Sequence, residues 1–336
     1  MGRGKITIDE MARPRWEASY SIVGAHSGIQ ICTWTKKALR GKGVCYKQKF
    51  YGVDCHRCAQ VSPALAWCSE NCIFCWRPNE WMKEIKMRRS EVDEPAEIIA
   101  GVVEARKKLV SGIKGAQDSE KELWEESFKL FPSHWAISLS GEPTLYPKLP
   151  EMVKELRKHK EVRSIFIVSN GQEPKMIEKL AKMDALPTQL YISVDACNAK
   201  MFEKVNRPKY RDGWKRLNKT LGLLPELDCR RVIRYTLIKG VNDSEKEMKG
   251  FAEMFEKTKA DFIEIKGYMF LGDSRKRLVF ENMPKHEYVR EYAKKIAKML
   301  PNYEIIDEDY LSRIVLLKRK NSPYANYISN AVAGRR

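Results

Sequence analysis

The 336-residue chain carries a formal net charge of +18, from 62 Lys and Arg against 44 Asp and Glu, and contains nine cysteines. This length suits one large α/β domain with additions, or two domains. Seven of the cysteines lie between Cys32 and Cys75, whereas a secreted disulfide scaffold is short and cysteine-dense throughout. The first residues lack the apolar core of a signal peptide, and no apolar run approaches membrane-spanning length. We therefore expect a cytoplasmic protein without a membrane partner.

The first motif in chain order is an evenly spaced array of three cysteines. Cys32, Cys45 and Cys58 are separated by twelve residues each. Cys55 interrupts the pattern, and we leave it out of any ligand assignment. Lys47 lies two residues after Cys45, in a stretch of basic residues that contains no acid.

A second group, Cys68-x3-Cys72-x2-Cys75, follows the apolar run Val61–Trp67. A cubane iron–sulfur cluster normally takes four thiolates. Three thiolates from one tight loop would hold three irons and leave the fourth open to an outside ligand.

Zinc is the competing interpretation of these cysteines. Cys55-x2-Cys58 and Cys72-x2-Cys75 together have a spacing close to that of a zinc ribbon. Four ligands complete tetrahedral zinc, so three surplus cysteines count against this interpretation.

Short apolar runs alternate with amphipathic helical segments from residue 61 onward, a pattern typical of βαβ units with a parallel sheet. The expected strands are Val61–Trp67, Trp135–Leu139, Ser164–Val168, Leu190–Val194, Val232–Ile238 and Phe262–Ile265. Six strands predict an α/β fold with a partial (β/α)6, TIM-like barrel rather than a closed eight-stranded one.

Additions are expected on both sides of this barrel. A helix over 284–300 and a hairpin built from Tyr303–Ile306 and Ile314–Leu317 would follow it. The predicted organisation is an N-terminal extension with the first cysteine array over 1–60, the barrel over 61–283 and a C-terminal helix and hairpin over 284–336.

Polar motifs close three of the expected strands, and ligands gather at the carboxyl ends of such strands. They are Ser140-Gly141-Glu142-Pro143, Ser169-Asn170-Gly171 and Ser193-Val194-Asp195. Each motif alone also suits an ordinary turn. Their succession along the chain favours a ligand site.

The positive charge is clustered, which suits a polyanion whose binding releases counterions. One cluster surrounds Lys47, and another is formed by Arg230, Arg231 and Arg234. Aromatic residues near some of these cations favour RNA over other polyanions, although a solvated basic surface is the alternative. The candidate nucleic-acid-binding residues are Arg207, Lys209, Arg211, Lys215, Arg216, Arg275, Lys276 and Arg277.

These motifs together make residues 61–270 resemble the core of the radical S-adenosylmethionine (SAM) enzymes, with Phe74 at the aromatic position before the last cysteine. The resemblance implies that Cys68, Cys72 and Cys75 bind a [4Fe–4S] cluster whose open iron chelates S-adenosyl-L-methionine. It also implies a set of residues around the methionine and nucleoside parts of that cofactor: Ser140, Gly141, Glu142, Ser169, Asn170, Ser193 and Asp195.

The upstream array narrows the resemblance to the SAM-dependent tRNA 4-demethylwyosine synthases in their single-domain archaeal form. The resemblance implies a second [4Fe–4S] cluster on Cys32, Cys45 and Cys58. That family condenses N1-methylguanosine-37 of tRNA(Phe) with pyruvate. The flavodoxin-like domain of the eukaryotic relatives is not expected here, so an external electron donor is implied.

Lys47 occupies the position at which this family is proposed to use a lysine as the Schiff-base partner of pyruvate. A phosphate-binding lysine is an equally good interpretation of the residue. Two other functions stay open on the residues alone: another two-cluster radical SAM enzyme, such as a tRNA methylthiotransferase-like protein, and a zinc-stapled RNA-binding protein.

Overall fold

The computed structural model describes residues 6–328 except 11, 83–84, 116–117 and 119. The ends of the expected terminal extensions, 1–5 and 329–336, lie outside the described residues. Among the residues that are described, no helix has the length and apolar character needed to cross a membrane.

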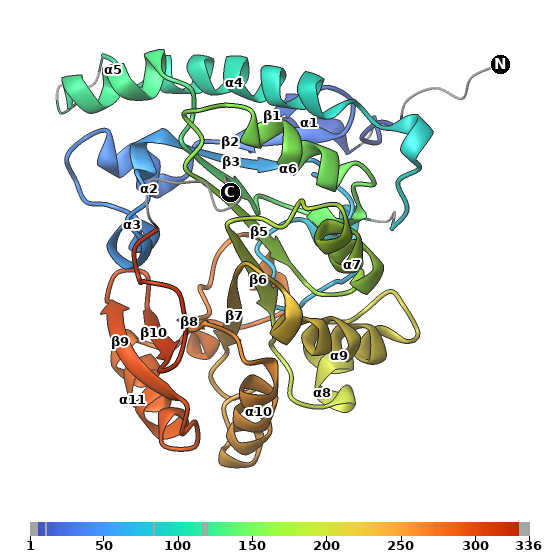
Figure 1. The fold of residues 1–336 in the computed structure, drawn as a ribbon, viewed down its shortest axis with the longest axis vertical. Coiled ribbons are helices and arrows are strands. Elements are labelled where there is room, and N and C mark those ends of the chain that lie inside the picture. Colours follow the sequence, from blue (N-terminus) through green and yellow to red (C-terminus); the bar gives the residue numbers. More distant parts are fainter. Residues whose placement is uncertain (1–5, 11, 83–84, 116–117, 119, 329–336) are drawn as a thin grey trace.

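One ten-stranded sheet runs through the molecule in the order β1-β2-β3-β4-β5-β6-β7-β8-β10-β9. The strands are β1 Ser21–Val23, β2 Ser27–Gln30, β3 Cys58–Ser62, β4 His134–Ile137, β5 Ser164–Ser169, β6 Gln189–Ser193, β7 Arg230–Leu237, β8 Phe262–Gly267, β9 Tyr303–Asp309 and β10 Ile314–Arg319. Strands β3 to β8 are parallel neighbours in chain order. The sheet is curved and open, which confirms the predicted partial barrel (Figure 1).

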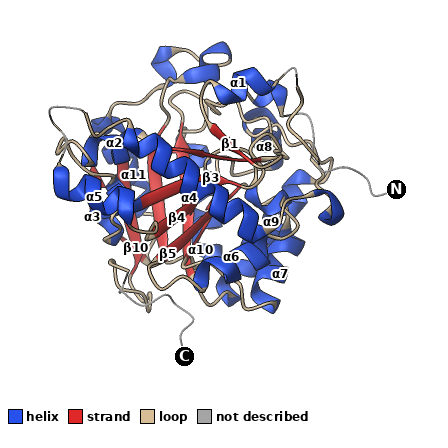
Figure 2. Ribbon diagram, turned by 90° about the horizontal axis from the view of Figure 1, so that it is seen from above, coloured by secondary structure: helices blue, strands red, loops and turns tan. Residues whose placement is uncertain are grey.

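The helices alternate with the parallel strands, as the periodicity predicted. They are α1 Arg13–Glu17, α2 Thr33–Ala38, α3 Tyr46–Tyr51, α4 Pro95–Ser111, α5 Lys121–Lys129, α6 Leu149–Arg157, α7 Pro174–Lys182, α8 Ala199–Val205, α9 Gly213–Leu223, α10 Glu245–Thr258 and α11 His286–Ala297. Helices α4, α6, α7, α9, α10 and α11 follow one another around the outer side of the sheet (Figures 1 and 2).

Two parts of the sheet differ from the expectation. The first barrel strand is β3, Cys58–Ser62, rather than Val61–Trp67. Pro63 has no N–H to offer a sheet, and the residues after it instead present carbonyl groups to the loop that follows β4. In addition, the antiparallel strands β1 and β2 extend the sheet beyond β3. They are three and four residues long and give little periodic signal.

The C-terminal hairpin forms as predicted and completes the other edge of the sheet. β9 and β10 pair antiparallel, and β10 pairs with β8. The expected N-terminal, barrel and C-terminal segments therefore all contribute strands to one sheet.

Helix α3 covers the inner face of the barrel. Its aromatic residues Tyr46, Phe50 and Tyr51 pack in one buried cluster with residues of β5, β6, β7, β8 and β10. The cysteine array that precedes and follows this helix is thereby held against the inside of the sheet.

Candidate active site

The loop that carries Cys68, Cys72 and Cys75 follows β3 and is held by the segment after β4. Ser140 donates its hydroxyl to the carbonyl of Leu65 at 2.9 Å, and the Glu142 amide donates to the carbonyl of Trp67 at 2.7 Å. Gly141 lies between these contacts with φ +67°, where a Cβ would overlap the carbonyl oxygen of Ala64 and lie 2.5 Å from that of Trp67. Only glycine fits this close approach of two backbones.

The motifs after β4 and β5 meet beside Cys68. The Asn170 amide donates to Glu142 Oε2 at 2.8 Å, and the Asn170 side chain donates to Ser69 Oγ at 3.0 Å and to Cys68 Sγ at 3.9 Å. Ser169 is buried, and its hydroxyl accepts the Gly171 N–H at 3.0 Å. Residues expected near one ligand are thus brought together around this cysteine.

Buried polar groups without partners surround Cys72. Its thiol donates to Glu70 Oε2 at 3.1 Å, and the Asn206 amide donates to the same oxygen at 3.1 Å. Among the described residues, Glu70 Oε1, Asn206 Oδ1 and Asp195 Oδ2 have no hydrogen-bond partner. Burial raises the pKa of Glu70 to about 8 and that of Asp195 to about 6. Orphaned acceptors of this kind call for a ligand that brings donors, such as an amino group or ribose hydroxyls.

The upstream cysteines come from three different elements. Cys32 caps α2 and accepts the Thr35 N–H at 3.4 Å, Cys45 precedes α3, and Cys58 begins β3. Burial is the main cause that raises the pKa of Cys45 to about 12 and also raises that of Cys58, and neighbouring thiols of the same array add to both shifts. Iron would have to displace these protons, as thiolate ligation requires.

The cysteines therefore form two sets. Burial raises the pKa of Cys68 and Cys72, and Cys75 adds to both shifts, whereas Cys55 is influenced by Cys32 and Cys45 of the upstream array. The two CxxC pairs of the zinc interpretation are divided between these sets. Within the described residues, no three His, Cys, Asp or Glu side chains lie close enough to share a single metal ion.

Lys47 projects from α3 toward the inner face of the sheet. Its ammonium lies 5.0 Å from the ring centroid of Phe166 on β5 and 5.3 Å from that of Tyr191 on β6. Its charge also influences Cys45 and Cys58, so it lies near the upstream cysteines.

Several side chains on the face of the sheet that Lys47 approaches keep part of their surface exposed, and this group of residues is here called the inner chamber. The side chains that define it are Lys47, Ser193, Arg234, Thr236 and Lys266. Ser193, Arg234 and Glu264 are aligned in register across β6, β7 and β8, so all three face the same side. Asp195, beyond the end of β6, accepts the Thr236 N–H at 2.7 Å.

The basic residues differ in how far their side chains are exposed. Arg207, Arg211, Lys215, Arg275 and Lys276 are exposed. Arg277 donates to the carbonyls of Ile73 and Cys75, Lys209 donates to that of Met82, and Arg216 donates to that of Gln172. Arg277 thus braces the cysteine loop, and Arg207 lies next to that loop, because the Asn71 amide donates to the carbonyl of Arg207.

The cluster of Arg230, Arg231 and Arg234 is not the polyanion surface that its sequence indicated. Arg231 forms an ion pair with Asp261 at 2.9 Å, and Arg230 donates to the carbonyls of Ala325 and Asn326. Arg234 belongs to the inner chamber. Sequence reasoning also missed Glu70 and Asn206, since Glu70 occupies an unspecified position between two motif cysteines and Asn206 belongs to no recognisable motif.

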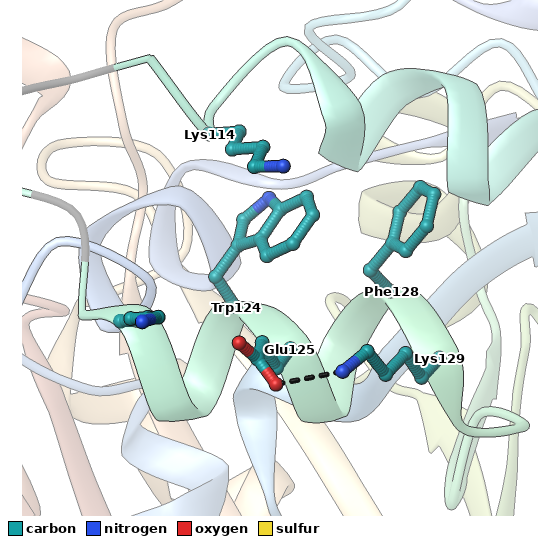
Figure 3. A pocket seen from close by; sticks show the side chains of 6 residues that line it. Lys114, Trp124, Glu125, Phe128 and Lys129 are labelled. Carbon is teal, nitrogen blue, oxygen red and sulfur yellow. Dashed lines mark hydrogen bonds and ion pairs between the residues drawn. The ribbon is translucent and has the colours of Figure 1, made fainter.

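A surface pocket of about 470 Å³ lies apart from these residues, between the end of α4 and α5 (Figure 3). Trp124 and Phe128 stack there with centroids 4.9 Å apart, and Lys114 lies over the Trp124 ring. None of the predicted site residues lines it.

Comparisons with known proteins agree with this geometry. Residues 63–252 match the family model of the radical SAM superfamily, and residues 257–319 match that of wyosine base formation. The chain is 44% identical over 323 residues to the S-adenosyl-L-methionine-dependent tRNA 4-demethylwyosine synthase of Pyrococcus abyssi, covering 94% of this chain and 92% of that protein. It is 39% identical over 310 residues to the synthase of Methanocaldococcus jannaschii, covering 90% and 93%.

Two solved structures share the whole fold. A structure of TYW1 with a lysine-pyruvate adduct bound superposes with a TM-score of 0.81 at 34% identity, covering 96% of this chain and 99% of that chain. A crystal structure of archaeal TYW1 gives a TM-score of 0.75 at 32% identity, covering 95% and 99%.

Proposed function

Because the chain belongs to the S-adenosyl-L-methionine-dependent tRNA 4-demethylwyosine synthases of the radical SAM superfamily, we propose that it condenses pyruvate with N1-methylguanosine-37 of tRNA(Phe), using two [4Fe–4S] clusters and an external electron donor. It is an enzyme that acts on tRNA and uses S-adenosyl-L-methionine with a [4Fe–4S] cluster. The identity of the second substrate, the second cluster and the tRNA position are the parts that we propose.

One observation carries the proposal: a lysine projects into the inner chamber close to a second set of three thiols. Within the described residues, the Lys47 ammonium has no carboxylate partner and lies over Phe166 and Tyr191 instead. Such an apolar setting suits an amine that reacts with a carbonyl. The lysine-pyruvate adduct in the related TYW1 structure supports this role for a lysine in the fold.

We assign the downstream set to the SAM-binding cluster and the upstream set to the second cluster. Cys68, Cys72 and Cys75 would hold the first, and Cys32, Cys45 and Cys58 would hold the second. When bound, the first cluster with S-adenosyl-L-methionine supplies the radical chemistry that removes hydrogen from the N-methyl group.

The residues at the strand ends position that cofactor. The backbone around Gly141 and the orphaned oxygen of Asp195 would accept donors from its amino and hydroxyl groups. Four hydrogen-bonded residues would fix the walls of this site: the Asn170 amide donates to Glu142, Ser140 donates to the carbonyl of Leu65, and Ser169 accepts the Gly171 N–H. Ser193 belongs to the inner chamber.

The direct test is product formation by the purified protein. Anaerobic incubation with S-adenosyl-L-methionine, dithionite, pyruvate and N1-methylguanosine-37 tRNA(Phe) should give a tricyclic base that carries two carbons from labelled pyruvate. Absence of that base while 5′-deoxyadenosine accumulates would contradict the proposed substrates.

The exposed cations beside the cysteine loop should bind the tRNA backbone. Replacing Arg207, Arg211 and Lys215 together with alanine should weaken tRNA binding about tenfold or more and lower the slope of log affinity against log salt by about two, because three phosphate contacts are lost. Binding titrations at several salt concentrations measure both quantities.

A control with the same change in charge comes from α10. Lys246, Lys249 and Lys257 are exposed there, and their alanine variant should keep the wild-type slope. Equal slopes for both triple variants would exclude the patch as the tRNA-binding surface.

A further inference from the structure

The inner chamber contains a cation that has no partner among the described residues. Arg234 comes from β7, where Ile233 and Tyr235 are buried on the opposite side of the strand. The guanidinium forms no hydrogen bond or ion pair with the described part of the chain, although the carboxylates of Glu264 and Asp195 lie close enough to stabilise its charge. A guanidinium has five N–H donors, so this side chain is poised for an acceptor that comes from outside the protein.

The carboxylate aligned with Arg234 already accepts three hydrogen bonds. Glu264 is opposite Arg234 in register, but its Oε1 accepts the hydroxyls of Tyr51 at 2.8 Å and Tyr191 at 3.1 Å, and its Oε2 accepts that of Tyr46 at 3.2 Å. Three tyrosines thus hold Glu264 in place and keep it from pairing with Arg234. In the described part of the chain, the Arg234 guanidinium therefore has no hydrogen-bonded carboxylate partner. It lies on the face of the sheet that Lys47 approaches.

A second cation lies on the same face. Lys266 follows Glu264 by two residues on β8, donates to the carbonyl of Ser312 at 2.9 Å and lies 5.3 Å from the centroid of the Tyr46 ring. Burial, together with the charge of Arg234, lowers the pKa of Lys266 to about 8. The two cations therefore repel each other, and an anion between them would relieve that repulsion.

We propose that Arg234, assisted by Lys266, forms a carboxylate-binding subsite, and that its occupant is the carboxylate of the keto acid that reacts with Lys47. This inference rests on the proposed function. The carboxylate and keto carbons of pyruvate are bonded to each other, so its anion site must adjoin the nucleophile. Tyr191 provides that adjacency, because its ring lies 5.3 Å from the Lys47 ammonium and it precedes by two residues Ser193, which is opposite Arg234 on the neighbouring strand. The planar guanidinium matches a carboxylate with two parallel hydrogen bonds.

Borohydride trapping on the anaerobically reconstituted enzyme tests the subsite without the radical reaction. The Lys47 amine attacks the keto carbon, water leaves, and borohydride reduces the imine to a secondary amine that peptide mass spectrometry detects. Arg234→Gln should raise the pyruvate concentration for half-maximal trapping by about 30-fold or more. Pyruvamide, which has the keto group without the negative charge, should trap equally in the wild type and the variant.

Two further variants complete the comparison. Arg234→Lys keeps the positive charge but loses the pair of parallel N–H donors. The pyruvate concentration for half-maximal trapping should therefore rise by about tenfold, less than in Arg234→Gln. Arg290→Gln removes an arginine from the surface of α11, where it pairs with Glu308, and should leave trapping unchanged. Iron content and melting temperature identify any variant that fails to fold. If Arg234→Gln fails to fold, the test uses Arg234→Lys and the comparison of pyruvate with pyruvamide in the wild type. Equal concentrations of the two ligands for half-maximal trapping in the wild type would overturn the subsite.

S-adenosyl-L-methionine also carries a carboxylate, so a separate measurement tests whether Arg234 binds that carboxylate instead of the one of the keto acid. The half-saturating concentration of S-adenosyl-L-methionine for 5′-deoxyadenosine formation should be the same in Arg234→Gln and the wild type. A shift in that value with unchanged pyruvate trapping would overturn the keto-acid assignment. Failure of the proposed function gives a different result, because the wild type would then trap neither ligand at Lys47, and the subsite would fall with it.

Discussion

Replacement of Lys47 with arginine should abolish formation of the tricyclic base, with a loss of turnover of at least about 1,000-fold. Arginine keeps the positive charge over Phe166 and Tyr191 but stays protonated, so it cannot form an imine with a keto acid. Borohydride trapping of pyruvate should also disappear. Formation of 5′-deoxyadenosine should continue, because Cys68, Cys72 and Cys75 belong to a separate set. Chromatography of digested tRNA and of the nucleoside fraction measures both products.

Lys49 offers a matched control on the same helix. It is exposed and pairs with Asp307 at 2.8 Å, so Lys49→Arg preserves its interaction and should retain wild-type turnover. Full turnover by Lys47→Arg would leave a phosphate-binding role as the better interpretation of Lys47 and would exclude the imine.

Gly141→Ala should reduce cleavage of S-adenosyl-L-methionine by at least about 100-fold. The added Cβ would overlap the Ala64 carbonyl and press on that of Trp67, and backbone groups cannot move aside as a flexible side chain can. The positive φ adds a further cost of about 1–3 kcal/mol for alanine. Because both carbonyls belong to the four residues before Cys68, relief of the clash displaces the cysteine loop, and a misplacement of about 1 Å costs about 100-fold in rate. Anaerobic assay of 5′-deoxyadenosine measures the effect.

Gly222→Ala is the corresponding control. Gly222 is exposed in α9 with no heavy atom within 4 Å of a built Cβ, so alanine should leave cleavage unchanged and stabilise the helix by up to about 1 kcal/mol. Wild-type cleavage by Gly141→Ala would show that the contact between the two loops does not position the cofactor.

The sequence predicted the barrel well because its parallel strands are buried on both faces. The runs at 164–168 and 190–194 differ from β5 and β6 by one residue, since continuous apolar segments leave little ambiguity. The first strand was misplaced because the apolar residues 63–67 form a loop that binds another loop. Their hydrophobicity reflects burial against the site rather than membership of the sheet.

The candidate site was predictable where spacing alone defines it and unpredictable where the fold brings distant residues together. The cysteine motifs and Gly141 are local patterns. From the sequence, Arg234 was grouped with Arg230 and Arg231 as one basic cluster. The number of charges along the chain does not show which side of a strand each residue faces. Glu264 acquires its role only through tyrosines from α3 and β6, more than seventy residues away.

We propose that two sets of three thiols hold two cubane clusters in this protein. The most direct test is an iron and sulfide count on the anaerobically reconstituted protein. About eight irons and eight sulfides per chain are expected, and about four of each after alanine replacement of either set, Cys32, Cys45 and Cys58 or Cys68, Cys72 and Cys75. Cys55→Ala should keep the full count. A wild-type protein with four irons, or with a single zinc, would contradict the account.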